Sequence, residues 1–94
     1  MKPIADLYWD ETSEAHLWQA HRVTPDEVEE VIFGVPGEES TYRMIRDGDF
    51  YLVFGETGSG RLLTIVGEFI EGDRFRPFGA RDMDRAEKHG YRRG

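Results

Sequence analysis

The sequence has no cysteine and no long apolar run. The lack of cysteine excludes a disulfide framework and a zinc site made of thiolates. No segment approaches the roughly 18 apolar residues that a membrane-spanning helix requires, so we expect no membrane association. The first residues, MKPIADLYWDE, also lack the apolar core of a secretory signal. We therefore expect a cytoplasmic protein.

Basic residues are scarce in the first part of the chain. The protein has 12 basic and 19 acidic residues and a net charge of -7, but residues 1–41 hold only two of the basic ones. Residues 74–94 hold seven basic and three acidic side chains. This asymmetry indicates a basic patch for a polyanion or an acidic partner segment, opposite an acidic face. A solvated helix whose charges serve solubility is the alternative.

Length and composition predict one folded domain over residues 1–94. A chain of 94 residues can bury one modest core, and 38% hydrophobic residues exclude a disordered chain. Residues 4–10 are expected to form a short strand or an extended segment. Residues 11–22 permit a helix on which Leu17, Trp18 and His21 share a face.

The clearest helix signal covers residues 24–34. Thr24 suits the N-cap, Pro25 suits the first helical position, and Glu27 has the spacing of a capping box with Thr24. Gly34 is placed to end the helix. The apolar face is formed by residues spaced i, i+3, i+4 and i+7: Val28, Val31, Ile32 and Val35.

From residue 41 the apolar period becomes two, which predicts four strands at 41–47, 50–56, 61–70 and 74–79 with hairpin connections. The 61–70 run is apolar on both faces and should be central, whereas Pro77 indicates an edge strand or a strand end. A short last helix over 82–90, capped by Asp82 and stopped by Gly90, completes the pattern. The predicted class is α+β: two N-terminal helices, a four-stranded antiparallel meander and a C-terminal helix.

The cations of the last segment fall at regular spacings. Arg74 and Arg76 lie two apart on a strand and should share a face. Arg81, Arg85, Lys88 and Arg92 follow at i, i+4, i+7 and i+11, which makes one stripe if the helix extends that far. Like charges at this spacing are mildly destabilising, so a bound phosphate or carboxylate partner is indicated. Pairing with Asp84, Glu87 and the acidic first helices is the alternative for each arginine.

Four segments together resemble a known family: YWDE, HRVTPDEVEEVI, YLVFGETGSGRLLTIV and DRFRPFGARDMDRAEKHGYRR. They are similar to the BrnT-type toxins of bacterial type II toxin–antitoxin modules, over nearly the whole chain. The most telling parts are the Gly-Arg strand and the R-x-R-x-x-x-A-R block. The resemblance implies a RelE-like ribonuclease fold and a metal-independent endoribonuclease, with RNA as substrate, a cognate antitoxin as partner, and DNA contacted only through that antitoxin.

The resemblance also implies the roles of particular residues. Arg61, Arg76 and Arg81 would bind the scissile phosphate and stabilise transition-state charge, and Glu87 is placed with them as a catalytic residue. Glu87 and His89 are the candidate general bases. The resemblance adds His21 and Tyr91 to the residues expected to bind RNA phosphate or the antitoxin. The spacing of the cations adds Arg74, Arg85, Lys88 and Arg92 to the same set.

The chain departs from the family pattern at several positions. The lysine and glycine that flank the helix-entry histidine are Ala20 and Arg22 here, the Ser of Ser-Ala-Arg is Gly79, and Pro77 interrupts the arginine strand. An acidic chain also repels RNA at long range. A noncatalytic protein-binding module of the same fold is therefore the alternative function. His16 and His21 have no carboxylate at metal-motif spacing, so neither a metal nor a cofactor is expected.

Overall fold

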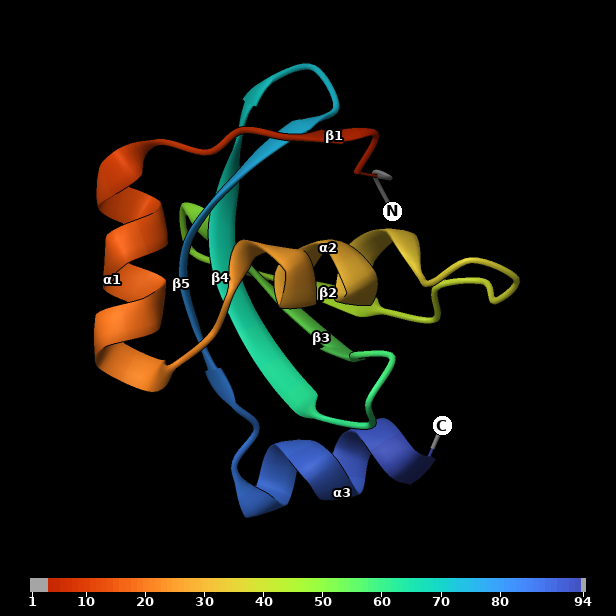
Figure 1. Cartoon of the computed structure of the whole chain (residues 1–94). Helices are drawn as coiled ribbons and strands as arrows, with labels where there is room; N and C mark the ends of the chain where they lie inside the picture. Colours follow the sequence, from red (N-terminus) through yellow and green to blue (C-terminus); the bar gives the residue numbers. More distant parts are fainter. Residues whose placement is uncertain (1–3, 94) are drawn as a thin grey trace.

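The computed structural model describes residues 4–93. Its elements follow the order β1 (Asp6–Leu7), α1 (Glu11–His21), α2 (Pro25–Phe33), β2 (Arg43–Asp47), β3 (Phe50–Glu56), β4 (Leu62–Glu71), β5 (Arg74–Asp82) and α3 (Arg85–Arg93) (Figure 1). The predicted α+β class is confirmed. The strands form one sheet in the order β1-β5-β4-β3-β2, with β4 in the centre as predicted.

The sheet differs from the predicted four-stranded meander because β1 is part of it. Strands β2 to β5 pair antiparallel, but β1 pairs parallel with β5, Asp6 opposite Arg74 and Leu7 opposite Phe75. The amide of Tyr8 also donates to the carbonyl of Phe75 at 2.9 Å. The sheet is therefore five-stranded and mixed. A two-residue strand is too short to carry an apolar period, so the sequence could not separate it from an extended segment.

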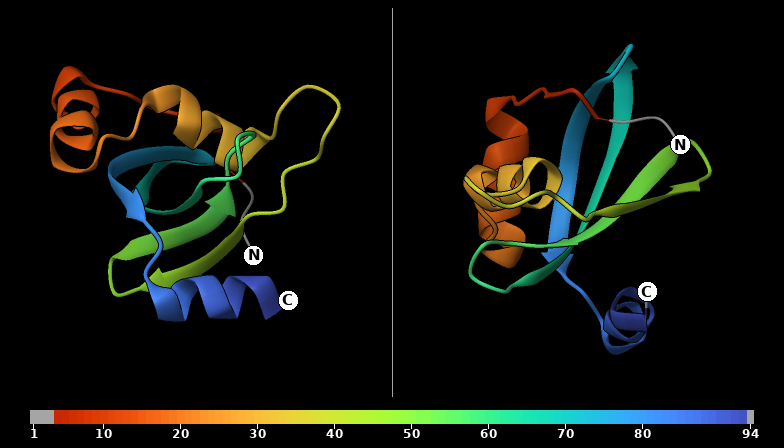
Figure 2. Two further views of the ribbon diagram at one scale, coloured as in Figure 1. Left: turned by 60° about the horizontal axis from the view of Figure 1, so that its bottom comes forward. Right: turned by 90° about the vertical axis from the view of Figure 1, so that its right-hand side faces the viewer.

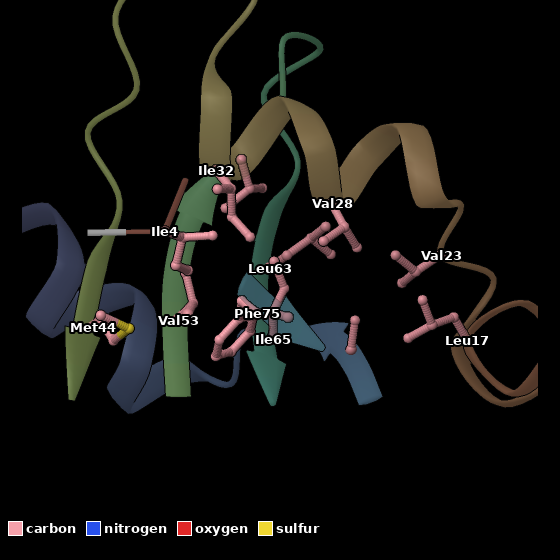
Figure 3. Packing of buried hydrophobic residues seen from close by; sticks show 12 residues of the cluster. Ile4, Leu17, Val23, Val28, Ile32, Met44, Val53, Leu63, Ile65 and Phe75 are labelled. Atoms are coloured by element: carbon pink, nitrogen blue, oxygen red, sulfur yellow. The ribbon is translucent and has the colours of Figure 1, made fainter. Parts of the chain in front are cut away.

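Helices α1 and α2 cover one face of the sheet, and α3 lies on the opposite side (Figure 2). The core lies between the first two helices and the sheet (Figure 3). Leu17 of α1, Val28 of α2, and Val53, Leu63 and Phe75 of the strands are fully buried there. Among residues 4–93, α3 is the only helix on the second face of the sheet.

Helix α2 is formed as its local signals predict. Thr24 accepts from the amide of Glu27, whose carboxylate accepts from the amide of Thr24, and Gly34 ends the helix at φ 81°. The prediction for α1 was partly wrong. Leu17 is buried, but Trp18 is 49% exposed and His21 is exposed too, because a helix turned toward β5 buries only one narrow stripe.

The predicted bounds of the last helix were also wrong. Asp82 is the last residue of β5, and α3 begins at Arg85 and continues through Gly90. Asp84 accepts from the amide of Glu87, and Glu87 accepts from the amide of Asp84, at 2.8 and 2.9 Å. This reciprocal pair satisfies the first free amides of the helix, which Asp82 cannot do while it pairs with β4.

Strand β5 does not end at Pro77. Beyond Phe75 no described strand pairs with its outer side, so the missing amide of Pro77 breaks no ladder there. The register with β4 shifts between Val66 and Gly67, and Phe78 is the extra residue of this bulge. The predicted edge strand is therefore correct only locally: β1 borders β5 at residues 74–75, whereas Pro77 lies in the part of β5 that no described strand borders.

Candidate functional sites around three arginines

Arg61 lies just before β4 and binds two carboxylates. Its Nε donates to Asp82 Oδ1 at 2.7 Å, and Nη1 donates to Glu27 Oε2 at 3.1 Å. Nη1 and Nη2 also donate to the main-chain carbonyls of Arg22 and His21, at 2.9 and 3.1 Å. The guanidinium therefore joins the end of α1, the start of α2 and the end of β5.

This network fixes the charge state of its members. Hydrogen bonding to Asp82, and then to Glu27, raises the pKa of Arg61. The Arg61 guanidinium in turn lowers the pKa of the Asp82 carboxyl. The Arg61 side chain is only 25% exposed, so its donors are directed into the protein. A phosphate could reach this guanidinium only in competition with two carboxylates.

Arg81 and Glu87 form a second cluster, on the α3 side of the sheet. Arg81 Nη1 and Nη2 donate to the two carboxylate oxygens of Glu87 at 2.7 and 2.9 Å. Thr64 on β4 donates to the same carboxylate at 3.0 Å. The Arg81 hydrogen bond is the main reason that the pKa of Glu87 is lowered to about 2. A carboxylate that releases its proton so readily is a weak general base.

Arg76 and Arg74 lie toward the β4–β5 hairpin. Arg76 Nε donates to Glu68 Oε2 at 3.0 Å, and its Nη1 is 3.8 Å from Asp10, the N-cap of α1. Arg74 is 3.3 Å from Asp6 and lies over the ring of Tyr8. Both arginines therefore have carboxylate partners within the protein. Only Asp10, at the N-cap of α1, belongs to the acidic first helices of the predicted alternative, because Asp6 and Glu68 lie on β1 and β4.

The three arginines that the resemblance places in one site are held in three separate networks. Arg81 and Asp82 are neighbours on β5, so their side chains leave opposite faces of the sheet. Arg61 binds Asp82 and the carbonyl of His21 on the face that α1 and α2 cover. Arg81 binds Glu87 of α3 on the opposite face. Of the four residues proposed as catalytic, the structure brings together only Arg81 and Glu87.

Helix α3 presents two different faces. Glu87, Gly90 and Tyr91 line a pocket of about 230 Å³ shared with β2 and β3, and the Tyr91 hydroxyl is 3.4 Å from that of Thr41. On the other side, a groove of about 470 Å³ is lined by Arg85, Lys88, His89 and Arg92. These four positions follow the helical repeat and lie opposite the first three.

Three of the groove residues are cations that the described side chains leave without an ion pair. Arg85, Lys88 and Arg92 form no ion pair with another described residue, unlike Arg61, Arg74, Arg76 and Arg81. Arg81 does not continue this stripe, because it lies on β5 and binds the inner face of α3. The basic stripe therefore begins at Arg85.

Sequence reasoning missed the carboxylates that hold Arg61. Asp82 was assigned to a helix cap and Glu27 only to a capping box, yet Glu27 has both roles. Nothing in the local sequence indicates that residues 27, 61 and 82 meet. By contrast, Asp84 and Glu87 have capping-box spacing, a signal that could have placed the start of α3.

Among residues 4–93, no three His, Asp or Glu side chains are arranged to hold a metal ion. In the same part of the chain, no helix is long and apolar enough to cross a membrane. Comparison with known proteins finds no family model that matches the chain and no curated protein with a matching sequence.

Proposed function

We propose that the chain is the toxin of a bacterial type II toxin–antitoxin module and acts as a metal-independent endoribonuclease that a cognate antitoxin neutralises. The resemblance of its four sequence segments to BrnT-type toxins is the starting point. The observation that carries the proposal is the outer face of α3, where three unpaired cations surround His89. This is the surface of an acidic chain best suited to hold a phosphodiester.

The chemistry follows from the residue types in the groove. Arg85, Lys88 and Arg92 would bind consecutive phosphates and offset the charge that develops on the scissile one. His89 would accept the proton of the 2'-hydroxyl, whose oxygen attacks the adjacent phosphorus. The 5'-oxygen of the next nucleotide then leaves and takes a proton from water, which yields a cyclic phosphate. His89 suits the base role better than Glu87, whose carboxylate is already bound by Arg81 and Thr64.

Arg81 would contribute in a different way from the groove cations. Its side chain is 39% exposed, and a phosphate at the start of α3 would compete with Glu87 for its donors. Arg61 holds α1, α2 and β5 together and is assigned a structural role in this proposal.

Cleavage of labelled RNA by the purified protein in EDTA tests the proposal. Wild type should cut the RNA, and His89→Ala should reduce the rate by about 100-fold or more, as expected for loss of a general base. A triple variant with glutamine at positions 85, 88 and 92 should lose binding and cleavage together. Arg46→Gln is the matched control, since Arg46 is exposed and its Nε donates to the main-chain carbonyl of Gly48, far from the α3 groove in sequence.

Growth after induced expression tests the same activity in cells. Wild type should arrest growth with loss of RNA, and His89→Ala and Arg81→Ala should not. If wild type, shown to be folded, leaves RNA intact at several concentrations, the ribonuclease proposal is wrong.

One observation favours the alternative, a noncatalytic protein-binding module. Arg61, Arg76 and Arg81 already bind carboxylates of the same chain. Under this alternative, the α3 cations bind an acidic protein segment and RNA is neither bound nor cut. Binding of single-stranded RNA, measured by fluorescence anisotropy at increasing salt, separates the two functions. Ribonuclease function requires binding that weakens steeply with salt.

A further inference from the structure

The second face of the sheet carries an apolar row that crosses four strands. Gly79 lies opposite Val66, Val66 opposite Leu52, and Leu52 opposite Ile45. We call these four residues the apolar row. The side chains of Ile45, Leu52 and Val66 point away from the core, because their strand neighbours are buried in it: Met44, Val53 and Ile65. Phe50 lies beside the row, nearer the β2–β3 turn. The centroid of its ring is 5.0 Å from the centroid of the Phe78 ring.

Helix α3 does not cover this row. Helix α3 lies instead over a neighbouring row of the same face, nearer the end of the sheet where β5 leads into α3. The residues of this second row are neighbours on successive strands: Arg81, Thr64, Phe54 and Arg43. In Figure 2, right, α3 is seen nearly end-on against the lower part of this face, below the β4–β5 hairpin. Ile45 is 52% exposed and Phe50 is 44% exposed. Apolar side chains on neighbouring strands thus remain open to solvent among the described residues.

The row continues into a pocket beneath α3. Ile45 also lines the pocket of about 230 Å³ formed with Phe54, Gly90 and Tyr91. Arg43 stands at its rim, exposed and without an ion pair to another described residue. An apolar side chain from a partner could enter this pocket while a neighbouring carboxylate reaches Arg43.

We propose that the apolar row binds an amphipathic helix of the antitoxin, with apolar side chains toward Ile45 and Phe50 and a carboxylate toward Arg43. This inference rests on the proposed function, which supplies the partner. The row lacks charge and so does not suit RNA. A second copy is the poorer occupant, because each copy carries a net charge of -7 and like charge opposes association. A carboxylate on the docked helix complements Arg43, the cation that borders the row at the pocket.

Photo-crosslinking in a co-expressed complex tests the surface. The probe is the protein encoded by the reading frame adjacent to the gene for this chain. A photoreactive residue at position 45 or 50 should crosslink to it. The matched control is position 33, because Phe33 is 47% exposed but belongs to α2 on the other side of the sheet. Crosslinks at position 33 and none at 45 or 50 would overturn the inference.

Affinity provides a second measurement. Ile45→Asp and Phe50→Asp should each weaken the complex by about 30-fold or more, as expected for a central apolar contact. Phe33→Asp should leave its dissociation constant unchanged. Circular dichroism would confirm that each variant folds. If Ile45→Asp does not fold, Ile45→Ala provides a milder change at the same position. Unchanged affinity in folded variants of positions 45 and 50 would also overturn the inference.

The two proposals fail in different ways. A complex formed through another surface, or no complex at all, overturns docking at the apolar row. RNA cleavage by the isolated chain is measured without the partner, so it can still support the toxin proposal in either case. Conversely, a complex at the apolar row without any RNA cleavage would support the noncatalytic alternative.

Discussion

Arg81 and Glu87 form a two-pronged ion pair, in which each of the two terminal guanidinium nitrogens of the strand residue donates to one carboxylate oxygen of the helix residue. Because Thr64 and the amide of Asp84 bind the same carboxylate, Glu87 is the main polar link between α3 and the sheet. The position of α3, and of its outer cations, therefore depends on one ionised side chain.

The stability of this link should depend on pH. The folded-state pKa of Glu87 is lowered to about 2 from its ordinary 4.5. The stabilisation is therefore fully present above about pH 4.5 and is lost as pH falls toward 2. Glu87→Gln should be less stable than wild type at pH 7, with a difference that shrinks over this range. Urea unfolding of both proteins at a series of pH values measures this difference in the free energy of unfolding.

A control variant separates the contribution of Glu87 to the pH dependence of stability from that of other carboxylates. Arg61 also lowers the pKa of Asp82, which contributes in the same direction, so Glu87→Gln should remove only part of the pH dependence. Glu29→Gln, at an exposed position of α2, should follow the wild-type curve. Equal pH dependence in Glu87→Gln and wild type would contradict the prediction.

Arg61→Ala should destabilise the fold. It leaves Glu27, Asp82 and two carbonyls without their shared donor, and we expect a loss of about 1–3 kcal/mol in the free energy of unfolding. Arg46→Ala should change it by less than about 0.5 kcal/mol. Urea unfolding at pH 7 measures both. If Arg61→Ala keeps full stability but loses RNA cleavage, Arg61 acts on substrate as the family resemblance implies.

Gly67→Ala should disrupt the packing of β4 on β5. A Cβ at this position would lie 2.5 Å from the ring of Phe75 and 2.6 Å from the carbonyl oxygen of Arg76. Since Phe75 is fully buried, we expect a loss of about 1–3 kcal/mol. Gly79→Ala is the control, because its nearest contact would be Val66 at an ordinary 3.9 Å. Similar thermal midpoints for the two variants would refute the steric argument.

Gly90→Ala should stabilise α3. Gly90 lies inside the helix, and an added Cβ would meet nothing within 4 Å. Alanine in place of a helical glycine contributes about 0.5–1 kcal/mol. The amides of α3 should therefore exchange with solvent roughly two to five times more slowly. Faster exchange, or loss of helix in circular dichroism, would show that the position requires glycine.

The sequence was informative where the signals are local. Thr24, Pro25 and Glu27 specify the start of α2 within four positions, and the apolar period marks β3 and β4. The start of α3 was misplaced because Asp82 and Asp84 are both good caps, and the choice depends on pairing with β4. Tertiary register, which local spacing does not encode, decided between them.

The candidate site was harder to predict for the same reason. The basic character of α3 follows from composition and helical repeat, but the pairing of Arg61 with Asp82 and Glu27 requires three distant segments to meet. The apolar row was visible as alternation in β2 and β3. Its exposure could not be read from the sequence, since that depends on where α3 crosses the sheet.

The parallel pairing of β1 with β5 also has a consequence for the order in which the protein forms. Residues 6–7 are made before their partners at 74–75, which appear only after α1, α2 and strands β2 to β4 have been made. Contacts between such distant segments form slowly, because a long loop must close first. The sheet can therefore be completed only after residues 74–75 have been made, and the basic helix α3 is made after β5. In a protein whose proposed activity harms its own host, this delay would leave time for an antitoxin to be present before the toxin is whole.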